Sequence, residues 1–293
     1  MSDCDNSVRM SHPQLHWNFS LPVLLPIVLF ASIYIWRFRQ ARAEAGGRGA
    51  GWPQALAFAG CILVLLVSVV SPIDRLGEEY LFSAHMVQHI LLGDLAPLLL
   101  LLSLSRVIMR PATRRLHRIE RKLGRFAHPA FFIVAWLALV YVWHIPALYN
   151  AALEHPVLHG LEHATFFTAG TLLWWPLIQP VPMRHRLEGL QGLLYVFAAK
   201  ASLGVLGLYL TWSKGVAYDY YNHVPQIWGL NHLEDQNVGG ALMMVEQAIV
   251  LVIVEAILFV KMLNASEEAE RRRERLEDAE EARRLEAIAT AQQ

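Results

Sequence analysis

Two pairs of histidines in this sequence share a spacing that suits a metal ion. His85 and His89 are four residues apart, and His159 and His163 repeat the arrangement. On a helix, residues four apart lie on the same face, so each pair directs two imidazoles to one point. Imidazole nitrogen is a common ligand of zinc, copper and iron. The spacing predicts a metal or cofactor site shared by two helices, which must then be neighbours.

Three methionines favour copper among these metals. Met86 follows His85 directly, and Met243 and Met244 stand together in a late apolar segment. Thioether sulfur is a soft ligand that selects Cu(I). The chain has only 2 cysteines, far apart in the sequence, so delivery through a thiolate pair is not expected. We therefore expect copper held mainly by imidazole.

Other chemistries fit the same residues. The stretch from His159 to His163 also reads HxxEH, the inverted zinc-protease pattern, with Glu162 as the base. Bis-histidine haem, with one ligand from each of two helices, would also explain paired histidines in an apolar setting. A third possibility is that the histidines only pack between helices. A transporter is disfavoured, because the two halves of the chain show no internal repeat.

Helices that cross a membrane must position these residues. Of 293 residues, 55% are hydrophobic and 17% charged, whereas soluble domains carry about 25% charged residues. The apolar residues fall into runs that can span a bilayer core about 30 Å thick as helices. We predict an all-α polytopic membrane protein with seven transmembrane helices, at Phe19–Trp36, Trp52–Val70, Phe82–Ser105, Ala130–His144, Leu158–Ile178, Gly189–Trp212 and Gly239–Leu263.

The basic residues orient these spans. Of the 25 Lys and Arg residues, 21 lie in segments that follow the first, third, fifth and seventh spans, and three lie on the other side. The positive-inside rule then places the N-terminus outside and the C-terminus in the cytoplasm. We divide the chain into a short extracytoplasmic segment 1–18, a membrane domain 19–263 and a charged helical tail 264–293. The formal net charge is zero, so nucleic acid is not an expected partner.

Most histidines fall on the side that this orientation makes the outside. Ten of the 13 lie in outer loops or in the outer part of a span, and the exceptions are His117, His128 and His185. Both histidine pairs therefore enter the membrane from the same face, at similar depth. That face carries almost no Lys or Arg to repel a cation.

A few ionisable side chains are expected inside the membrane, where they are costly and usually functional. Asp94 lies five residues after His89, and Lys200 lies near the middle of the sixth span, so the two are expected to pair. Glu162 and Glu246 lie in outer halves of spans, where a carboxylate could orient a ligating imidazole.

Four stretches resemble the CtaG-type cytochrome c oxidase assembly factors of bacteria, seven-span proteins associated with the caa-type oxidase. The stretches are Ser83–Leu92, Trp143–Asn150, His155–His163 with Trp174–Pro176 after it, and Asp235–Gly240. The resemblance covers about Trp17 to Leu263. It leaves out the charged tail.

The resemblance implies a role in assembling haem–copper oxidase in the plasma membrane, through copper supply to the catalytic subunit. The sequence contains no GxxxxGK[ST], no G-x-S-x-G and no dinucleotide-binding motif, so enzymatic activity is not expected. The resemblance also implies oxidase subunits and an extracytoplasmic copper chaperone as partners. By position it points to His85, His89, His144, His159 and His163, with Gln88, Glu162 and Asp235 as polar neighbours. A metal-free scaffold for oxidase assembly is the alternative.

Overall fold

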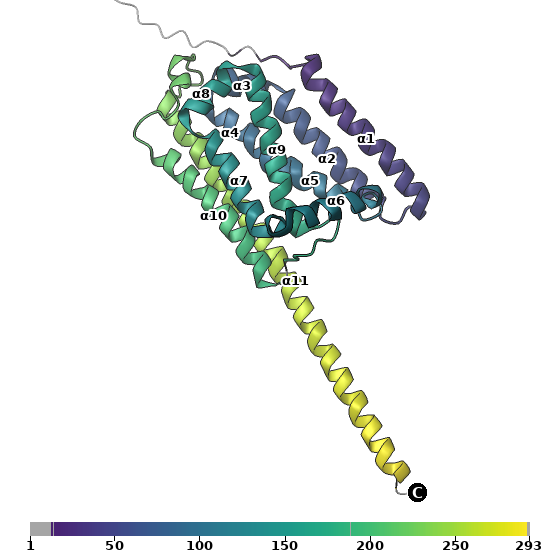
Figure 1. Cartoon of the computed structure of the whole chain (residues 1–293). Coiled ribbons are helices and arrows are strands. Elements are labelled where there is room, and N and C mark those ends of the chain that lie inside the picture. Colours follow the sequence, from purple (N-terminus) through teal and green to yellow (C-terminus); the bar gives the residue numbers. More distant parts are fainter. Residues whose placement is uncertain (1–12, 14, 188, 292–293) are drawn as a thin grey trace, which may run out of the picture.

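The computed structural model describes residues 13, 15–187 and 189–291 of the chain. Most of the expected segment 1–18 lies outside these residues. The described part is helical and contains no strand, which confirms the all-α class. The helices form a bundle from which one very long helix projects (Figure 1).

In chain order the elements are α1 (Leu21–Ala45), α2 (Trp52–Val69), α3 (Pro72–Glu79), α4 (Phe82–Ile90), the π-helix η1 (Leu91–Leu95), α5 (Ala96–Ser103), α6 (Arg110–Leu123), the 3₁₀-helix η2 (Gly124–Ala127), α7 (Pro129–Trp143), α8 (Pro146–Glu154), α9 (Pro156–Ile178), α10 (Leu190–Trp212), the 3₁₀-helix η3 (Asp219–His223) and α11 (His232–Ala291).

Five helical segments are long and apolar enough to cross a membrane: Leu21–Ala45, Trp52–Glu79, Phe82–Ser103, Leu190–Trp212 and His232–Leu285. A sixth is counted if α6–η2 and α7, bent by 79° at their junction, form one crossing. The chain is therefore a multi-pass membrane protein. The count of seven stays a prediction: α7 has only 15 residues, and polar residues interrupt the apolar sequence of α9.

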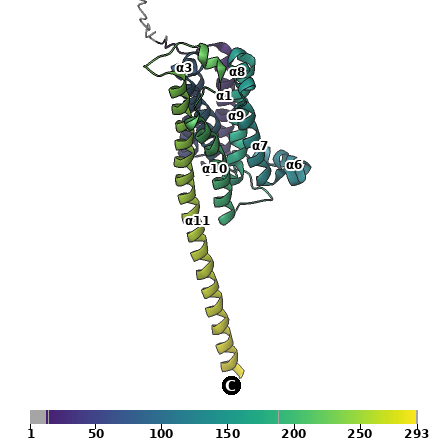
Figure 2. The ribbon, with the colours of Figure 1, turned by 90° about the vertical axis from the view of Figure 1, so that its left-hand side faces the viewer.

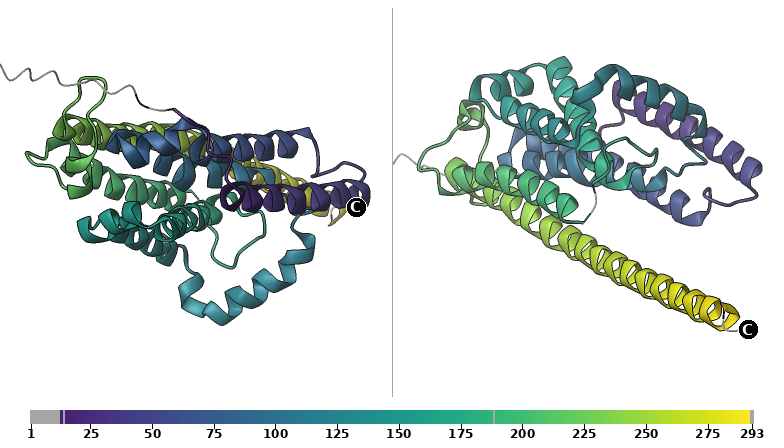
Figure 3. Two further views of the ribbon diagram at one scale, coloured as in Figure 1. Left: turned by 90° about the horizontal axis from the view of Figure 1, so that it is seen from above. Right: turned by 60° about the horizontal axis from the view of Figure 1, so that its bottom comes forward.

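The segment α4–η1–α5 lies in the interior of the bundle and contacts α2, α9 and α11 along its length. The main apolar core joins side chains from α4, α7, α9, α10 and α11. By contrast, α1 packs loosely at one edge, where Leu21 is 72% exposed. Its apolar surface is suited to lipid rather than to water. Figure 3 shows α1 and α2 on one side of the bundle and the pair α10–α11 on another.

A glycine contact allows α9 to cross η1 at very short range. A Cβ atom added to Gly170 would collide with the carbonyl oxygen of Gly93. Small residues at such crossings let membrane helices pack backbone to backbone. The contact places α9 directly against the segment that carries the first histidine pair.

The two ends of the bundle differ in character. One end, which we call the histidine end, carries α3, α8 and η3. The other, the basic end, carries α6 and the loop between α9 and α10 (Figure 1). The helix α11 runs unbroken for 60 residues and continues well past the basic end.

Candidate metal centre

Both histidine pairs meet inside the bundle. The ring centroids of His85 and His159 are 5.3 Å apart, and those of His89 and His163 are 5.8 Å apart. The adjacency of α4 and α9, on which the predicted site depends, is therefore present. His85, His89 and His159 are each at most 6% exposed.

A carboxylate from a distant helix fixes the start of α4. The backbone N–H groups of Phe82 and Ser83 donate to Asp235 on α11, over 2.6 and 3.2 Å, and the Ser83 hydroxyl donates to the same carboxylate. The residue before α4 is Leu81, whose side chain cannot cap a helix. Asp235 takes over that role, so it holds the helix that carries His85 rather than facing the histidines itself.

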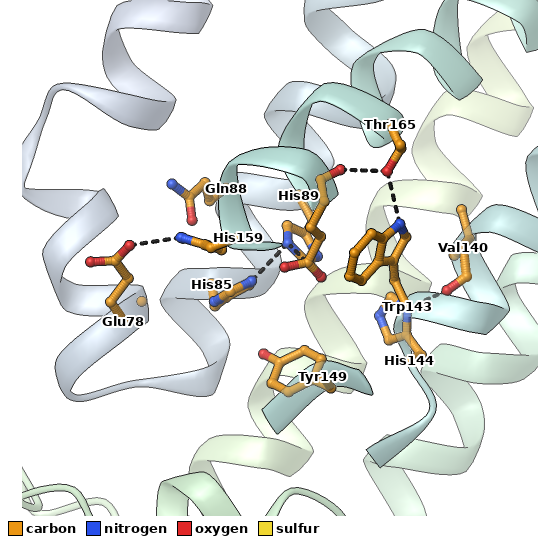
Figure 4. Close-up of polar contacts among 12 residues, drawn as sticks. Glu78, His85, Gln88, His89, Val140, Trp143, His144, Tyr149, His159 and Thr165 are labelled. Carbon is orange, nitrogen blue, oxygen red and sulfur yellow. Dashed lines mark hydrogen bonds and ion pairs between the residues drawn. The ribbon is translucent and has the colours of Figure 1, made fainter. Parts of the chain in front are cut away.

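The short helix α3 folds back onto α4 and brings an acidic side chain with it. Ser71 caps α3 through its hydroxyl, and Pro72 occupies its first turn. A Cβ atom on Gly77 would lie only 2.9 Å from the Cα atom of His85, so only glycine permits this approach. The next residue, Glu78, then reaches His159 (Figure 4).

Two histidines have one ring nitrogen occupied and the other free. His159 Nδ1 lies 2.7 Å from Glu78 Oε1, and His144 Nδ1 lies 2.7 Å from the Val140 carbonyl oxygen. Each Nδ1 must carry the proton, because its neighbour can only accept. The Nε2 atoms of both rings are buried without a hydrogen-bond partner. They are therefore lone pairs available to a metal ion, in the arrangement that metal-ligating histidines usually show.

The first pair is oriented ring nitrogen to ring nitrogen. His85 Nε2 and His89 Nε2 are 2.7 Å apart, and neither ring has a partner for its buried Nδ1 atom. A neutral imidazole has one N–H and one lone pair, so this contact leaves one acceptor and one donor unsatisfied. Unsatisfied buried polar atoms are rare and need an explanation. A shared cation would explain the close approach of the two Nε2 atoms, since it takes a lone pair from each while the proton of each ring stays on Nδ1.

A buried carboxylate completes the cluster. Glu162 is fully buried, its Oε1 lies 3.6 Å from His89 Nε2, and neither of its oxygens accepts a hydrogen bond from the described residues. Two ligand groups result, His85–His159–His163 and His85–His89–Glu162. In each group the ligand atoms lie within 4.8 Å of one another. His85 belongs to both, so the five side chains form one continuous cluster of candidate ligands.

The donor set fits a metal better than a macrocycle. Neighbouring rings are separated by centroid distances of 4.0–4.2 Å within each pair. The cavity beside them, lined by His89, His144, Met86 and Met243, holds about 30 Å³. That volume suits one or two water-sized molecules and not a haem. Two of the three predicted methionines thus lie next to the histidines, whereas Met244 lies outside this cavity, at the α10–α11 interface near Gly207.

The predicted ion pair of Asp94 and Lys200 is present deeper in the bundle. Trp174 Nε1 donates to the other Asp94 oxygen over 2.6 Å, and the Lys200 ammonium lies 5.1 Å from the Trp174 ring centroid. Asp94 lies in η1, where the π-turn changes the direction of its side chain relative to His89. The 30 Å³ cavity extends from the histidines to Asp94 and Glu246.

Two predicted polar neighbours act away from the ligand atoms. Gln88 Nε2 donates to Asp74 over 2.6 Å and to the Ser68 carbonyl oxygen over 2.9 Å, which ties α4 to α3 and α2. Glu246 accepts a hydrogen bond from the Gln247 side chain. It lines the cavity together with Asp94 and interacts electrostatically with Lys200, so it belongs to the Lys200 side of the site.

Tyrosines that no sequence pattern had marked lie at the histidine end. Tyr149 lies 5.3 Å from His85 and 4.0 Å from Tyr218 between ring centroids. Tyr221 donates to the Gly77 carbonyl oxygen over 2.7 Å, and Tyr218 donates to that of His144 over 3.2 Å. Burial raises the pKa of Tyr218 and Tyr221, so both stay protonated donors.

Comparison with known proteins decides the family. The profile of the cytochrome c oxidase caa3 assembly factor (Caa3_CtaG) family matches residues 32–265. The chain belongs to this family. Membership confirms the resemblance drawn from the four sequence stretches, since the match includes all of them.

Relatives of the caa3 assembly factor chain occur in mycobacteria. An uncharacterized protein of Mycobacterium bovis is 26% identical over 289 residues, which covers 85% of this chain and 43% of the relative. An uncharacterized protein of Mycobacterium leprae is 22% identical, covering 81% of this chain and 38% of the relative. The chain thus spans less than half the length of these relatives. No solved structure matches it.

Proposed function

We propose that this chain assists the assembly of cytochrome c oxidase in the bacterial plasma membrane by binding copper at the histidine cluster and passing it to the catalytic subunit. Family membership supports the assembly role. The observation that carries the copper proposal is the meeting of His85, His159 and His163, whose ligand atoms lie within 4.8 Å of one another, together with the unpartnered buried Nε2 atoms of His159 and His163. Such groups are costly in a membrane unless a ligand satisfies them.

The overlap of the two ligand groups suggests how the metal moves. Copper held by His85, His159 and His163 can exchange ligands one at a time for His89 and Glu162, because His85 is common to both groups. The ion then never loses all its ligands. The step needs no redox-active thiol, which agrees with the fully buried position of Cys61, away from the cluster.

The direction of transfer follows from the orientation expected of the spans. With the basic end in the cytoplasm, the histidine end faces the exterior, where an extracytoplasmic copper chaperone would deliver the ion. The oxidase subunit would receive it from the same end or through the flank of α4 and α9. The chain acts in this proposal as a carrier, and Glu162 acts as a ligand rather than as the base of a hydrolase.

Metal analysis of the purified protein tests the copper proposal. Wild type and the variant His85→Ala/His159→Ala are loaded with copper in detergent, desalted and measured for bound copper and zinc. The matched control is His155→Ala/His223→Ala, which removes two exposed histidines. We expect copper in the wild type and the control, and its loss from the first variant.

Other outcomes would overturn the proposal. Full copper in the double variant would exclude the cluster as its site. Absence of metal from the wild type, with crosslinking to an oxidase subunit that survives loss of His85, His89, His159 and His163, would establish a metal-free scaffold. Bound zinc, together with a peptide-hydrolysing activity that depends on Glu162, would establish the zinc-hydrolase alternative suggested by the HxxEH pattern.

A further inference from the structure

A second site lies at the basic end, where α6 leaves the bundle. The segment Arg110–Ala127 is bent by 79° from α7, so α6 lies across the direction of the spans. Figure 2 shows it projecting from the side of the bundle. Such a helix lies along a membrane surface when one of its faces is apolar and the other basic.

The sequence of α6 meets that condition. Leu116, Ile119 and Leu123 share one face, and Ile119 is 51% exposed. Arg114, Arg118 and other basic residues occupy the opposite face. Each apolar side chain on the first face would be unfavourable in water and favourable at the boundary of the acyl chains.

An apolar crevice runs between α6 and the bundle. It has a volume of about 250 Å³ and is lined by Leu116 and Leu123 of α6, Phe132 of α7, and Leu172 and Trp175 of α9. The loop between α9 and α10 forms its remaining wall. A crevice of this lining and volume suits a hydrocarbon chain.

A basic pocket of about 590 Å³ adjoins the crevice. Arg114, Arg118, Arg121 and Arg184 line it, against the single acid Glu120. Within the part of the chain that the structure describes, the first three arginines form no ion pair with a carboxylate. Their guanidinium groups are therefore available to a phosphate, which arginine binds through paired N–H donors.

The two spaces are continuous, because both are lined by His117, Glu120, Pro182 and Met183. Their common wall is held in place from both sides. His117 Nε2 lies 3.0 Å from the Pro182 carbonyl oxygen, and the Arg184 backbone N–H donates to Glu120 over 2.7 Å. The loop is thus fixed to α6, and the apolar and basic compartments open into each other.

We propose that this composite site binds one anionic phospholipid, with an acyl chain in the crevice and the phosphate among the arginines. Basic pockets at the cytoplasmic ends of membrane helices recognise anionic headgroups in this way. Because the pocket has more arginines than acidic residues, it favours a negatively charged headgroup. Because the crevice is apolar, it favours a ligand with an acyl chain. The site is distinct from the histidine cluster and does not rest on the proposed function.

Native mass spectrometry of the full chain tests the proposal. The protein is exchanged into detergent that contains either phosphatidylglycerol or phosphatidylcholine, each in plain or brominated form. The lipid molecules that stay bound to the protein are then counted. The variant is Arg114→Gln/Arg118→Gln/Arg121→Gln. The control Arg271→Gln/Arg272→Gln/Arg273→Gln removes the same charge from the exposed tail. All six arginines are exposed, so neither variant should unfold the protein.

We expect the wild type and the tail control to retain phosphatidylglycerol in preference to phosphatidylcholine. Loss of three charges near a headgroup should weaken retention by about a hundredfold in the α6 variant. Brominated phosphatidylglycerol should quench more tryptophan fluorescence than brominated phosphatidylcholine, and Trp175→Phe should abolish the difference, since Trp175 lines the crevice.

Three results would overturn the proposal. Equal retention of both lipids by the wild type would deny recognition of the headgroup. Equal retention by the α6 variant and the tail control would move the site elsewhere. Retention of soluble glycerophosphoglycerol as strongly as the lipid would show an anion site that needs no acyl chain.

Discussion

Glu78 contacts His159 on the side of the ring that faces away from the other histidines, with 2.7 Å between Oε1 and Nδ1. The contact assigns the proton to Nδ1 and directs the Nε2 lone pair into the cluster. A carboxylate in this position also raises the basicity of the imidazole as a ligand. In the proposed copper site Glu78 would thus be a positioning residue, which orients His159 without being a ligand itself.

Replacing Glu78 should weaken metal binding without removing the site. For Glu78→Ala we expect copper affinity to fall by about 10–100-fold, with one full equivalent still bound at saturating copper. Titration against a competing chelator measures the affinity. The control is Glu79→Ala on the same helix, because Glu79 pairs with Arg75 instead. Unchanged affinity in Glu78→Ala would contradict the assigned role.

Removing the cap on α4 should cost stability and disturb the first histidine pair. Asp235→Ala leaves the Phe82 and Ser83 N–H groups without an acceptor. We expect the free energy of unfolding to fall by about 1–3 kcal/mol, measured by thermal unfolding in detergent. Asp278→Ala, in the exposed tail, serves as the control. A shift no larger than that of the control would show that α4 does not depend on Asp235.

Breaking the buried ion pair from one side should be worse than removing it entirely. Asp94→Asn removes the carboxylate that contacts the buried Lys200 ammonium, and breaking a buried pair from one side costs about 3–5 kcal/mol. Asp94→Asn combined with Lys200→Met should cost less than the sum of the single changes. Chemical unfolding of the three variants completes a double-mutant cycle. As a control, the exposed pair Glu267–Arg271 should show a coupling energy of about 0.5 kcal/mol or less. If the losses of unfolding free energy at Asp94 and Lys200 were simply additive, the two residues would not be energetically paired.

The crossing of α9 and η1 should not tolerate one added methyl group. In Gly170→Ala the new Cβ meets the Gly93 carbonyl oxygen, so α9 must move away and the melting temperature should fall by several degrees. Gly204→Ala is the matched control, because no atom lies within 4 Å of its added Cβ. Alanine favours the helix by up to about 1 kcal/mol at an unhindered site, so the control should melt no lower than the wild type. Equal changes in melting temperature in the two variants would mean that the close contact of Gly170 with Gly93 does not limit the packing of α9 against η1.

Local periodicity made the members of the histidine cluster predictable. The spacing of His85 with His89 and of His159 with His163 is a property of single helices, and the depth of Asp94 and Lys200 follows from their places in apolar runs. These features needed no knowledge of the tertiary fold. The family resemblance added His144, whose free Nε2 atom the structure places beside the same cavity.

The residues that hold and orient these histidines were harder to infer. Glu78 falls in the stretch between two predicted spans, and its role exists only because α3 folds back onto α4 at Gly77. Asp235 was expected beside the histidines, but it accepts a hydrogen bond from the backbone N–H of Phe82, which lies 153 residues away in the sequence. Tyr149 lies within one of the stretches used for the family resemblance, yet no periodicity marks it. Such contacts depend on tertiary packing, which a one-dimensional pattern does not contain.

The unbroken length of α11 has a mechanical consequence. At about 1.5 Å per residue, its 60 residues extend some 90 Å, and the part beyond residue 263 reaches roughly 40 Å past the membrane domain. No glycine or proline follows Gly240, so the shaft has no hinge. The first turn of the same shaft carries Asp235, which grips α4. One continuous helix therefore joins the exposed tail at one end of the protein to the contact that holds the start of α4 at the other.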